Sequence, residues 1–464
     1  MAEREGLKDL LAEALRAARA DHTEIRLDRT WATAIAFRGS RLEGATTACE
    51  IGGRVRCLNR GKGWGVASFT GVENVPAMVL RAHELSLAVP VQTPISLADI
   101  PVRSEDHITD LDGDVRGVTL AEKRDLIERL NQEMLGSDRR IVDTHVSYED
   151  AVTERWVATS AGVMLYDISP TVRMAAAAVA SEEGFLERAF ESWAARGGWR
   201  SVLSADPPFR IAARRAVALL AAPRPKAGVY PVVLDPRCIG ALVHQAIGHL
   251  SEADTLAERP DLNERMRTGR RVASDLVTIG DDGSASGLTG SLHFDDEGTP
   301  TQNTLLVQHG VLIGRLHTRA TAGREGTRPT GNARAASFRH VPEARLTNTY
   351  VANGRGTPEE LIRGIRYGLY CCDAMGGDLD HDGFTLRTGH TQIIRDGQLT
   401  ELARPVVLAG DLAETLQRVD AVAGDFRWNQ LGTACARGAS GRIPVCEGAP
   451  HVRIDGLQVG GETA

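Results

Sequence analysis

The sequence lacks the features that would place the protein in a membrane or outside the cell. No apolar run among its 464 residues approaches the roughly 18–20 residues that a membrane-spanning helix requires. The segment Met1–Ala20 is rich in charged side chains and has no apolar core of the kind found in signal peptides. These absences predict a cytoplasmic protein that does not associate with membranes.

Cysteine and basic charge are also scarce. Seven cysteines are too few, and odd in number, to form a disulfide framework, so each is expected to be a buried small residue, a metal ligand or a reactive thiol. The formal net charge of −7 argues against a nucleic-acid-binding protein, in which basic side chains usually dominate one face. Phosphate-binding loops, dinucleotide-binding fingerprints and the nucleophile elbow of serine hydrolases are missing as well.

The length and the 42% hydrophobic content are sufficient for a large core and suggest two domains. In the first, residues 1–222, leucines at helical spacing are followed by short β runs between Thr23 and Ser68. Turn signals separate these runs at Gly39-Ser40, Gly52-Gly53 and Arg60–Gly63. This pattern predicts an N-terminal α+β domain built on an antiparallel meander.

Two helix starts are well marked. Thr119-Leu-Ala-Glu122 forms a capping box after a long connection over residues 89–118, and Thr357-Pro358 opens another helix with Glu360 at its third position. The second of these helices belongs to the predicted C-terminal domain, residues 223–464, which is otherwise rich in strand and turn patterns. The predicted fold class is therefore α+β, with a mainly antiparallel C-terminal domain that carries one histidine-bearing helix.

The most distinctive chemistry lies in His244-Gln-Ala-Ile-Gly-His249, within the apolar stretch Cys238–Leu250. In a straight α-helix five residues turn through roughly 140°, so the two imidazoles would point apart. A π-bulge supplies the extra residue that convergence on one metal requires, and Gly248 can absorb the distortion. Judged by spacing alone, two unrelated histidines remain the simpler interpretation.

The wider sequence resembles the TldD/PmbA family of metallopeptidases. Residues His244–Asp254 are similar to the family signature HExxxH followed by a Glu and an Asp. Further similar blocks follow the family order and span nearly the whole chain: Gly53–Cys57, Gly63–Ser68, Gly290–Gln302, Pro329–Arg334, Thr347–Tyr350 and Ile454–Gly461.

The resemblance implies a zinc ion held by His244, His249 and a cysteine near the C-terminus. Cys435 occupies the matching place and is the expected thiolate ligand, with Cys446 as the alternative. Two imidazoles and one thiolate leave zinc an open fourth position, which is the pattern of catalytic sites. Ligand softness favours zinc, while iron and copper remain alternatives.

Other polar residues near these motifs are candidates for supporting roles. Glu252 and Asp254 match family residues that would orient the ligands. His381 and three aspartates crowd the segment Gly376–Gly383, which is more simply a solvated turn than a remodelled substrate site. The acidic cluster Asp295–Glu297 precedes a Gly-Thr-Pro turn, where carboxylates commonly cap backbone N–H groups.

Gln245 is the important departure from the family, which has Glu beside the first ligand. A carboxylate there can take a proton from water and return it to the leaving amine, and loss of such a base typically costs roughly 10²–10⁴-fold in rate. The change is either a deliberate one that traps substrate or a natural one. Glu252 as a substitute base is disfavoured, because it matches a ligand-orienting residue.

What the resemblance implies overall is a metallopeptidase subunit that hydrolyses amide bonds of unfolded peptides, which bind as an added β-strand. It also implies a homodimer or a heterodimer with a TldE/PmbA-like paralogue. The alternatives are a natural-product biosynthesis protein, for example of antibiotics, acting on a small amide- or thioether-bearing intermediate, and a non-catalytic metal-stabilised partner subunit.

Overall fold

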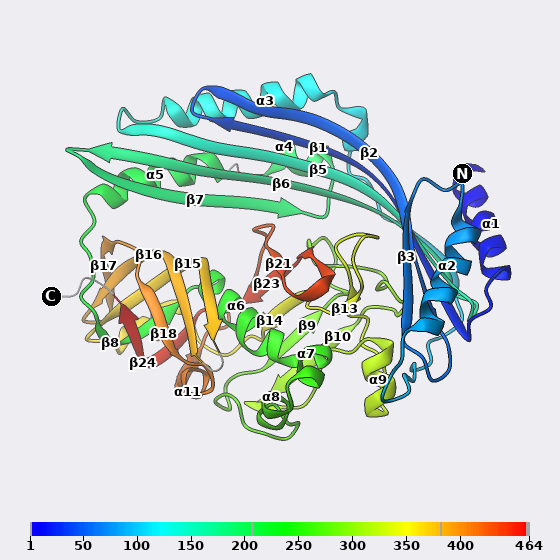
Figure 1. Ribbon diagram of the computed structural model, residues 1–464. Coiled ribbons are helices and arrows are strands. Elements are labelled where there is room, and N and C mark those ends of the chain that lie inside the picture. The colour runs from blue at the N-terminus through cyan, green and yellow to red at the C-terminus, as the bar shows by residue number, and fades with distance from the viewer. Residues whose placement is uncertain (1, 206–207, 381–382, 461–464) are drawn as a thin grey trace.

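The computed structural model describes residues 2–205, 208–380 and 383–460. One large twisted sheet comes from the N-terminal half of the chain and lies over a C-terminal body of further sheets, to which it is joined at one side (Figure 1). The fold is mixed α and β, as predicted. None of the helices in these ranges is both long enough and apolar enough to span a membrane.

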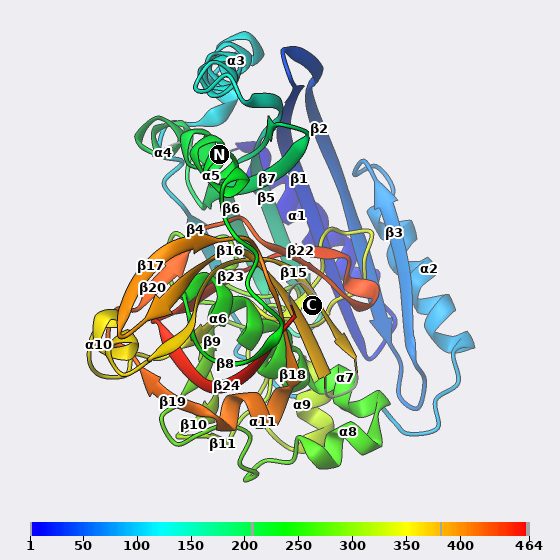
Figure 2. The ribbon, with the colours of Figure 1, turned by 90° about the vertical axis from the view of Figure 1, so that its left-hand side faces the viewer.

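The N-terminal sheet has seven strands in the order β3-β2-β1-β5-β6-β4, with β7 also paired to β6. Apolar side chains from the sheet and from its helices form one continuous core, and Figure 2 shows the helices α3 and α5 on the outer face of the sheet. The elements are β1 (His22–Arg38), β2 (Arg41–Leu58), β3 (Trp64–Thr70), β4 (Ser104–Ile108), β5 (Ile141–Thr159), β6 (Met164–Glu182), β7 (Phe185–Ala195), α1 (Ala2–Arg16), α2 (Val75–Ala88), α3 (Leu120–Leu135), α4 (Trp199–Ser204) and α5 (Pro208–Leu220).

Parts of the predicted meander are wrong. Gly52 and Gly53 do not form a turn but lie inside the long strand β2. A side chain at either position would collide with an aromatic ring, of Phe338 at Gly52 and of Phe69 at Gly53, so these glycines provide space and not a change of direction. The predicted long connection over residues 89–118 contains β4, and β7 has no counterpart among the predicted strands.

The two predicted helix starts are confirmed. The Thr119 hydroxyl accepts a hydrogen bond from the Glu122 N–H at 3.2 Å, and the Glu122 carboxylate accepts one from the Thr119 N–H at 2.9 Å. Thr357 and Glu360 form the same reciprocal pair at the start of α10 (Pro358–Arg363). Local capping satisfies N–H groups that the first helical turn leaves free, which is why sequence alone locates both starts.

Two more large sheets build the C-terminal body. Their strands run in the orders β11-β10-β9-β14-β23-β20 and β15-β8-β24-β18-β16-β17, with β19 paired to β24. Most pairs are antiparallel, and β8–β15 and β14–β23 are parallel. The strands are β8 (Gly228–Leu234), β9 (Ile279–Asp282), β10 (Asn303–Gln308), β11 (Val311–Leu312), β14 (Asn348–Val351), β15 (Tyr367–Asp380), β16 (Gly383–Arg395), β17 (Gln398–Ala403), β18 (Val407–Asp411), β19 (Val419–Val422), β20 (Arg427–Asn429), β23 (Cys446–Ala449) and β24 (Val452–Gly460).

The segment around Gly376, predicted as a turn, belongs mainly to strand β15, which continues to Asp380 and pairs with β16. His381 lies outside the described residues.

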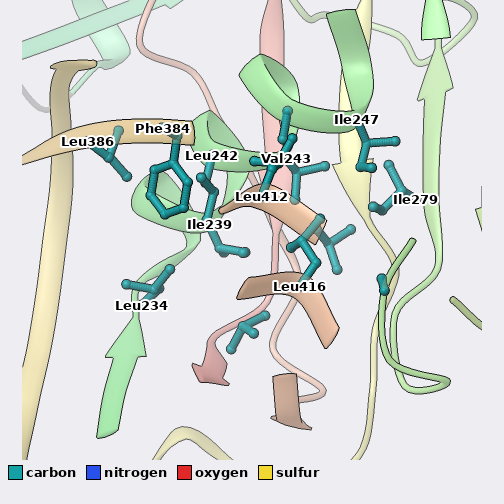
Figure 3. Close-up of a cluster of buried hydrophobic side chains, with 14 of the residues drawn as sticks. Leu234, Ile239, Leu242, Val243, Ile247, Ile279, Phe384, Leu386, Leu412 and Leu416 are labelled. Atoms are coloured by element: carbon teal, nitrogen blue, oxygen red, sulfur yellow. The ribbon is translucent and has the colours of Figure 1, made fainter. Parts of the chain in front are cut away.

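Helix α6 (Pro236–Val243) lies between the two C-terminal sheets and fixes the position of the histidine motif. The Asp235 carboxylate caps it by accepting a hydrogen bond from the Cys238 N–H at 2.8 Å. Its side chains Ile239, Leu242 and Val243 are buried among residues of both sheets (Figure 3). Because burying each such side chain contributes about 1.5–3 kcal/mol, the end of α6, where His244 follows, is firmly held.

Buried ion pairs join the N-terminal sheet to the C-terminal body. Arg26 of β1 and Arg155 of β5 both contact the Asp296 carboxylate, the latter at 3.2 Å. Arg56 of β2 contacts the Glu297 carboxylate at 2.6 Å. Removing one member of a buried pair weakens the compensation of the remaining charge, and in this junction Asp28 and Glu24 provide the arginines with further carboxylate partners.

Asp295, the third residue of the acidic cluster Asp295–Glu297, has a different role. The Asp295 carboxylate accepts hydrogen bonds from the backbone N–H groups of Glu297 and Thr299, both at 2.9 Å. This is the backbone capping expected for a carboxylate before a Gly-Thr-Pro turn. All three acidic side chains therefore have structural partners within the protein.

We expect Asp296→Ala to lower the free energy of unfolding by up to about 3–5 kcal/mol, because it removes one of the two carboxylates, Asp296 and Asp28, that compensate the buried Arg26 and the partly buried Arg155. Urea unfolding followed by circular dichroism measures the change. Glu401→Ala is the matched control, since its pair with Arg395 is exposed, and it should leave the free energy of unfolding nearly unchanged. Equal effects of the two substitutions would contradict the structural role of the junction.

Candidate metal centre

A π-helical turn follows α6 and brings the two histidines to one side. The turn covers His244–Gly248 and leads into a 3₁₀ turn, His249–Ser251, and the His249 N–H reaches the His244 carbonyl five residues back. The ring centroids of His244 and His249 are 5.0 Å apart. The predicted extra residue in the turn is thus confirmed, and it is the reason that a five-residue spacing gives neighbouring imidazoles.

Gly248 serves this turn in a different way from the one predicted. Its φ of −54° and ψ of −64° are ordinary for a helical residue, so it does not absorb a backbone distortion. A Cβ atom at this position would lie only 2.9 Å from the Leu346 Cδ1 atom. Glycine lets the turn pack directly against the Leu346 side chain, which a larger residue would force to shift.

Cys435 reaches the same place from a distant hairpin, formed by β21 (Ala434–Ala436) and β22 (Arg442–Pro444). Its Sγ atom lies 3.1 Å from the His249 Nε2 atom. One ligand atom each of His244, His249 and Cys435 lies within 4.8 Å of the others, and all three residues are buried. Cys446 is directed elsewhere, with its thiol 3.4 Å from the Asn429 carbonyl oxygen.

The unsatisfied atoms of this cluster fit a metal ion. Both ring nitrogens of His244 are buried and have no hydrogen-bond partner among the described residues, an arrangement that is costly unless another group satisfies them. The His249 Nδ1 atom is 3.0 Å from the Glu252 carboxylate, which leaves its Nε2 atom facing Cys435. Two imidazole nitrogens and a sulfur form a donor set that suits zinc.

Burial favours the neutral forms of the candidate ligands. It lowers the pKa of both imidazoles well below the usual range, so their lone pairs are free to bind a metal. It raises the pKa of the Cys435 thiol, against the opposing effect of the Arg345 guanidinium. A bound cation would reverse that balance, because coordination deprotonates a thiol.

Arg345 links the thiol to the carboxylate of the site. Its Nη2 atom lies 3.2 Å from the Cys435 Sγ atom, and its Nε atom lies 3.4 Å from the Glu252 carboxylate. Arg437 approaches the other oxygen of Glu252 at 3.8 Å. Burial nevertheless raises the pKa of Glu252 to about 7. The sequence gives no signal for Arg345, because its approach to the thiol depends on two segments 90 residues apart.

The other predicted site residues are placed as follows. Asp254 accepts a hydrogen bond from the Ala344 N–H at 2.6 Å, and burial raises its pKa to about 6. Its recorded partner is therefore a backbone group and not a candidate ligand. Gln245 is exposed, although both of its neighbours, His244 and Ala246, are buried.

Glu447 of β23 is a site residue that the sequence reasoning misses. It is buried, and its Oε1 atom lies 3.8 Å from the His244 Nδ1 atom. Its Oε2 atom accepts a hydrogen bond from the Thr433 hydroxyl at 3.2 Å. Burial raises its pKa to about 7. The available signal is a charged residue within an otherwise apolar strand.

The contacts Cys435–His249–Glu252 have the connectivity of a cysteine nucleophile with its base and orienting carboxylate. Two observations disfavour that interpretation. Burial raises the pKa of the Cys435 thiol, whereas a nucleophilic cysteine requires a lowered one. In addition, a thiol and imidazole pair leaves the His244 nitrogens unexplained.

A cavity of about 340 Å³ lies between the N-terminal sheet and the C-terminal body and is lined by residues of both. The candidate metal ligands do not line it, but Ile443 and Pro444 of the hairpin that carries Cys435 do. Its wall is charged and includes Arg155 and Arg196. The cavity therefore reaches the hairpin that supplies the third ligand.

Comparisons with known proteins show what the whole chain is similar to. Residues 227–461 match a family model described as the PmbA/TldA metallopeptidase C-terminal domain, and residues 113–222 match its central domain. A metalloprotease of Synechocystis is 36% identical over 446 residues, 96% of each chain. A zinc metalloprotease TldD homolog of Saccharolobus solfataricus is 31% identical over 252 residues, covering 53% of this chain and 55% of that one. The crystal structure of TldE from Thermococcus kodakarensis superposes with a TM-score of 0.77 at 17% identity, covering 98% and 99% of the two chains.

We expect the purified chain to bind about one zinc ion, as measured by metal analysis after removal of loosely bound metal. His249→Ala and Cys435→Ser should each weaken zinc binding by more than about 100-fold, because losing an outer partner alone costs about 10–100-fold. Cys446→Ser is the matched control and should leave the affinity unchanged. Loss of zinc in the Cys446 variant and not in the Cys435 variant would refute the ligand assignment.

Proposed function

Because the chain belongs to the PmbA/TldD metallopeptidase family, we propose that it is the zinc-binding subunit of a peptidase acting on unfolded peptides. The observation that carries this proposal is the convergence of His244, His249 and Cys435 on one buried point. The printed name of the Saccharolobus relative, a zinc metalloprotease, supports zinc as the ion. The family match supports amide-bond hydrolysis as the reaction.

The protein side chains would hold, orient and shield the reacting groups. A bound zinc ion would supply Lewis-acid polarisation of the scissile carbonyl and activation of a water molecule. Glu252 fixes the orientation of the His249 ring through its Nδ1 atom. Arg345 lies beside the Cys435 sulfur and can compensate the negative charge of a thiolate there.

Gln245 limits the proposed reaction. It stands beside the ligand His244 and is exposed, so its amide can hydrogen-bond to a substrate or to water. An amide cannot take up a proton near neutral pH, so it cannot act as the general base that a Glu would provide. We therefore expect this chain to bind zinc well and to hydrolyse peptides slowly.

The substrate and the partner follow from the same proposal. An unfolded peptide can add as a strand to the edge of a sheet, which gives hydrogen bonds that do not depend on its side chains. The similarity of the fold to TldE supports assembly with a TldE/PmbA-like paralogue, with a homodimer as the alternative. We place this assembly in the cytoplasm.

A second candidate function is favoured by Gln245 itself. A chain that holds its ligands but lacks the general base suits a reaction in which a small amide- or thioether-bearing intermediate replaces the peptide. Natural-product biosynthesis would supply such a substrate. A non-catalytic, metal-stabilised subunit would show the same ligands with no turnover.

Gln245→Glu is the test that separates these functions. If the chain is a peptidase that has lost its base, this substitution should raise the rate of unfolded-peptide hydrolysis by about 10²–10⁴-fold, with zinc affinity unchanged. Hydrolysis is measured with casein or a quenched fluorescent peptide, with and without a zinc chelator.

Gln245→Ala is the matched control and should stay as slow as the unsubstituted chain. If neither the Gln nor the Glu form cleaves peptide, alone or with a TldE/PmbA-like paralogue, and both still hold zinc, the peptidase proposal fails. The biosynthetic or binding function then takes its place.

A further inference from the structure

We propose that Glu447 is the positioning residue of His244: its carboxylate accepts a hydrogen bond from the His244 Nδ1–H group, so that the Nε2 atom is presented to the metal. This inference rests on the proposed zinc centre and adds a residue that neither the sequence motifs nor the family resemblance indicates. The two residues lie on different elements, the π-helical turn after α6 and the strand β23.

The arrangement at His249 provides the precedent within the same site. There the Nδ1 atom is 3.0 Å from the Glu252 carboxylate and the Nε2 atom faces Cys435. At His244 the Nδ1 atom is 3.8 Å from the Glu447 Oε1 atom, and a small side-chain rotation would bring the two atoms within hydrogen-bond distance. Both imidazoles would then use Nδ1 for a carboxylate and Nε2 for the metal, the usual outer arrangement of a zinc-bound histidine.

The surroundings of the Glu447 carboxylate point to His244 as its partner. Among the described residues, the imidazole within 4 Å of this carboxylate is that of His244, and a neutral imidazole can still donate a hydrogen bond from one ring nitrogen. A buried carboxylate is costly unless its oxygens accept hydrogen bonds. The Thr433 hydroxyl holds Oε2 at 3.2 Å, which leaves Oε1 directed at the imidazole.

The neighbouring backbone makes room for this side chain. A Cβ atom on Gly240 of α6 would lie 3.0 Å from the Glu447 Cβ atom. Glycine at this helical position therefore lets β23 approach α6 closely enough for the carboxylate to reach the turn that follows the helix. The strand, the helix and the turn together place the carboxylate beside the ring of His244.

The test measures zinc affinity by competition with a chromophoric chelator, using the full-length chain. We expect Glu447→Ala to weaken zinc binding by about 10–100-fold. Glu447→Gln should recover most of that loss, because its amide oxygen can still accept a hydrogen bond from the His244 Nδ1–H group. Thr433→Val removes the hydroxyl group that holds the Glu447 carboxylate. It should therefore weaken zinc binding less than Glu447→Ala does. If Glu447→Ala does not fold, the zinc affinity of Thr433→Val is the test.

Asp425→Asn is the matched control. Its carboxylate lies 2.6 Å from the His451 Nδ1 atom, so the substitution alters a similar carboxylate–imidazole contact whose imidazole is not a candidate ligand. Its zinc affinity should equal that of the unsubstituted chain. A second measurement is the Nδ1–H signal of His244 in nitrogen-15 spectra of the metal-free chain, which does not depend on the free energy of unfolding. This signal should diminish in Glu447→Ala and persist in Glu447→Gln.

The zinc affinities of these variants distinguish a failure of the Glu447 role from a failure of the proposed zinc centre. If His244→Ala abolishes zinc binding while Glu447→Ala and Thr433→Val both stay within twofold of the unsubstituted chain, the zinc centre stands and the role of Glu447 is refuted. If His244→Ala binds zinc as well as the unsubstituted chain, the zinc centre itself fails and this inference with it. A loss in Glu447→Gln as large as in Glu447→Ala also overturns the hydrogen-bond account.

Discussion

The site depends on one helical turn that is a residue wider than an α-helical turn. Because the chain makes a π-helical turn at His244–Gly248, two histidines five residues apart present their rings to the same point. Burial of α6 between two sheets holds the start of this turn, and the close contact of Gly248 with Leu346 holds its end. Had the helix continued regularly, the rings would diverge by roughly 140°, and Cys435 would meet only one of them.

Charged side chains surround the neutral imidazoles at this turn. The imidazoles are held neutral by burial, and Glu252 and Glu447 stand beside their Nδ1 atoms. Arg345 in turn contacts both the thiol and the Glu252 carboxylate. Such a network suits a cation with a thiolate, because two carboxyl groups lie beside the imidazoles and a guanidinium group lies beside the sulfur. The same arrangement is costly without one, as the unpartnered nitrogens of His244 show.

The sequence predicts a structural feature correctly where nearby residues determine it or where a family motif indicates a contact between distant residues. The capping boxes at Thr119 and Thr357 and the widened turn at His244 follow from residues within one or two helical turns, and the structure has all three. Gly52 and Gly53 mislead because glycine marks close packing as well as turns, and the ring that excludes a side chain at Gly52 lies 286 positions further along the chain, at Phe338. The roles of Arg345 and Glu447 cannot be predicted from the sequence for the same physical reason. The identity of a single charged residue does not indicate which distant side chain it will contact after folding.

Holding a metal and moving a proton are physically separate tasks in this site. The groups that would hold the ion are buried and close to one another, whereas Gln245, where the family resemblance implies a proton carrier, is exposed. A substitution at position 245 therefore changes the chemistry without disturbing the packing of α6 or the contacts of either histidine. That separation would allow an amide at position 245 to coexist with the cluster of His244, His249 and Cys435.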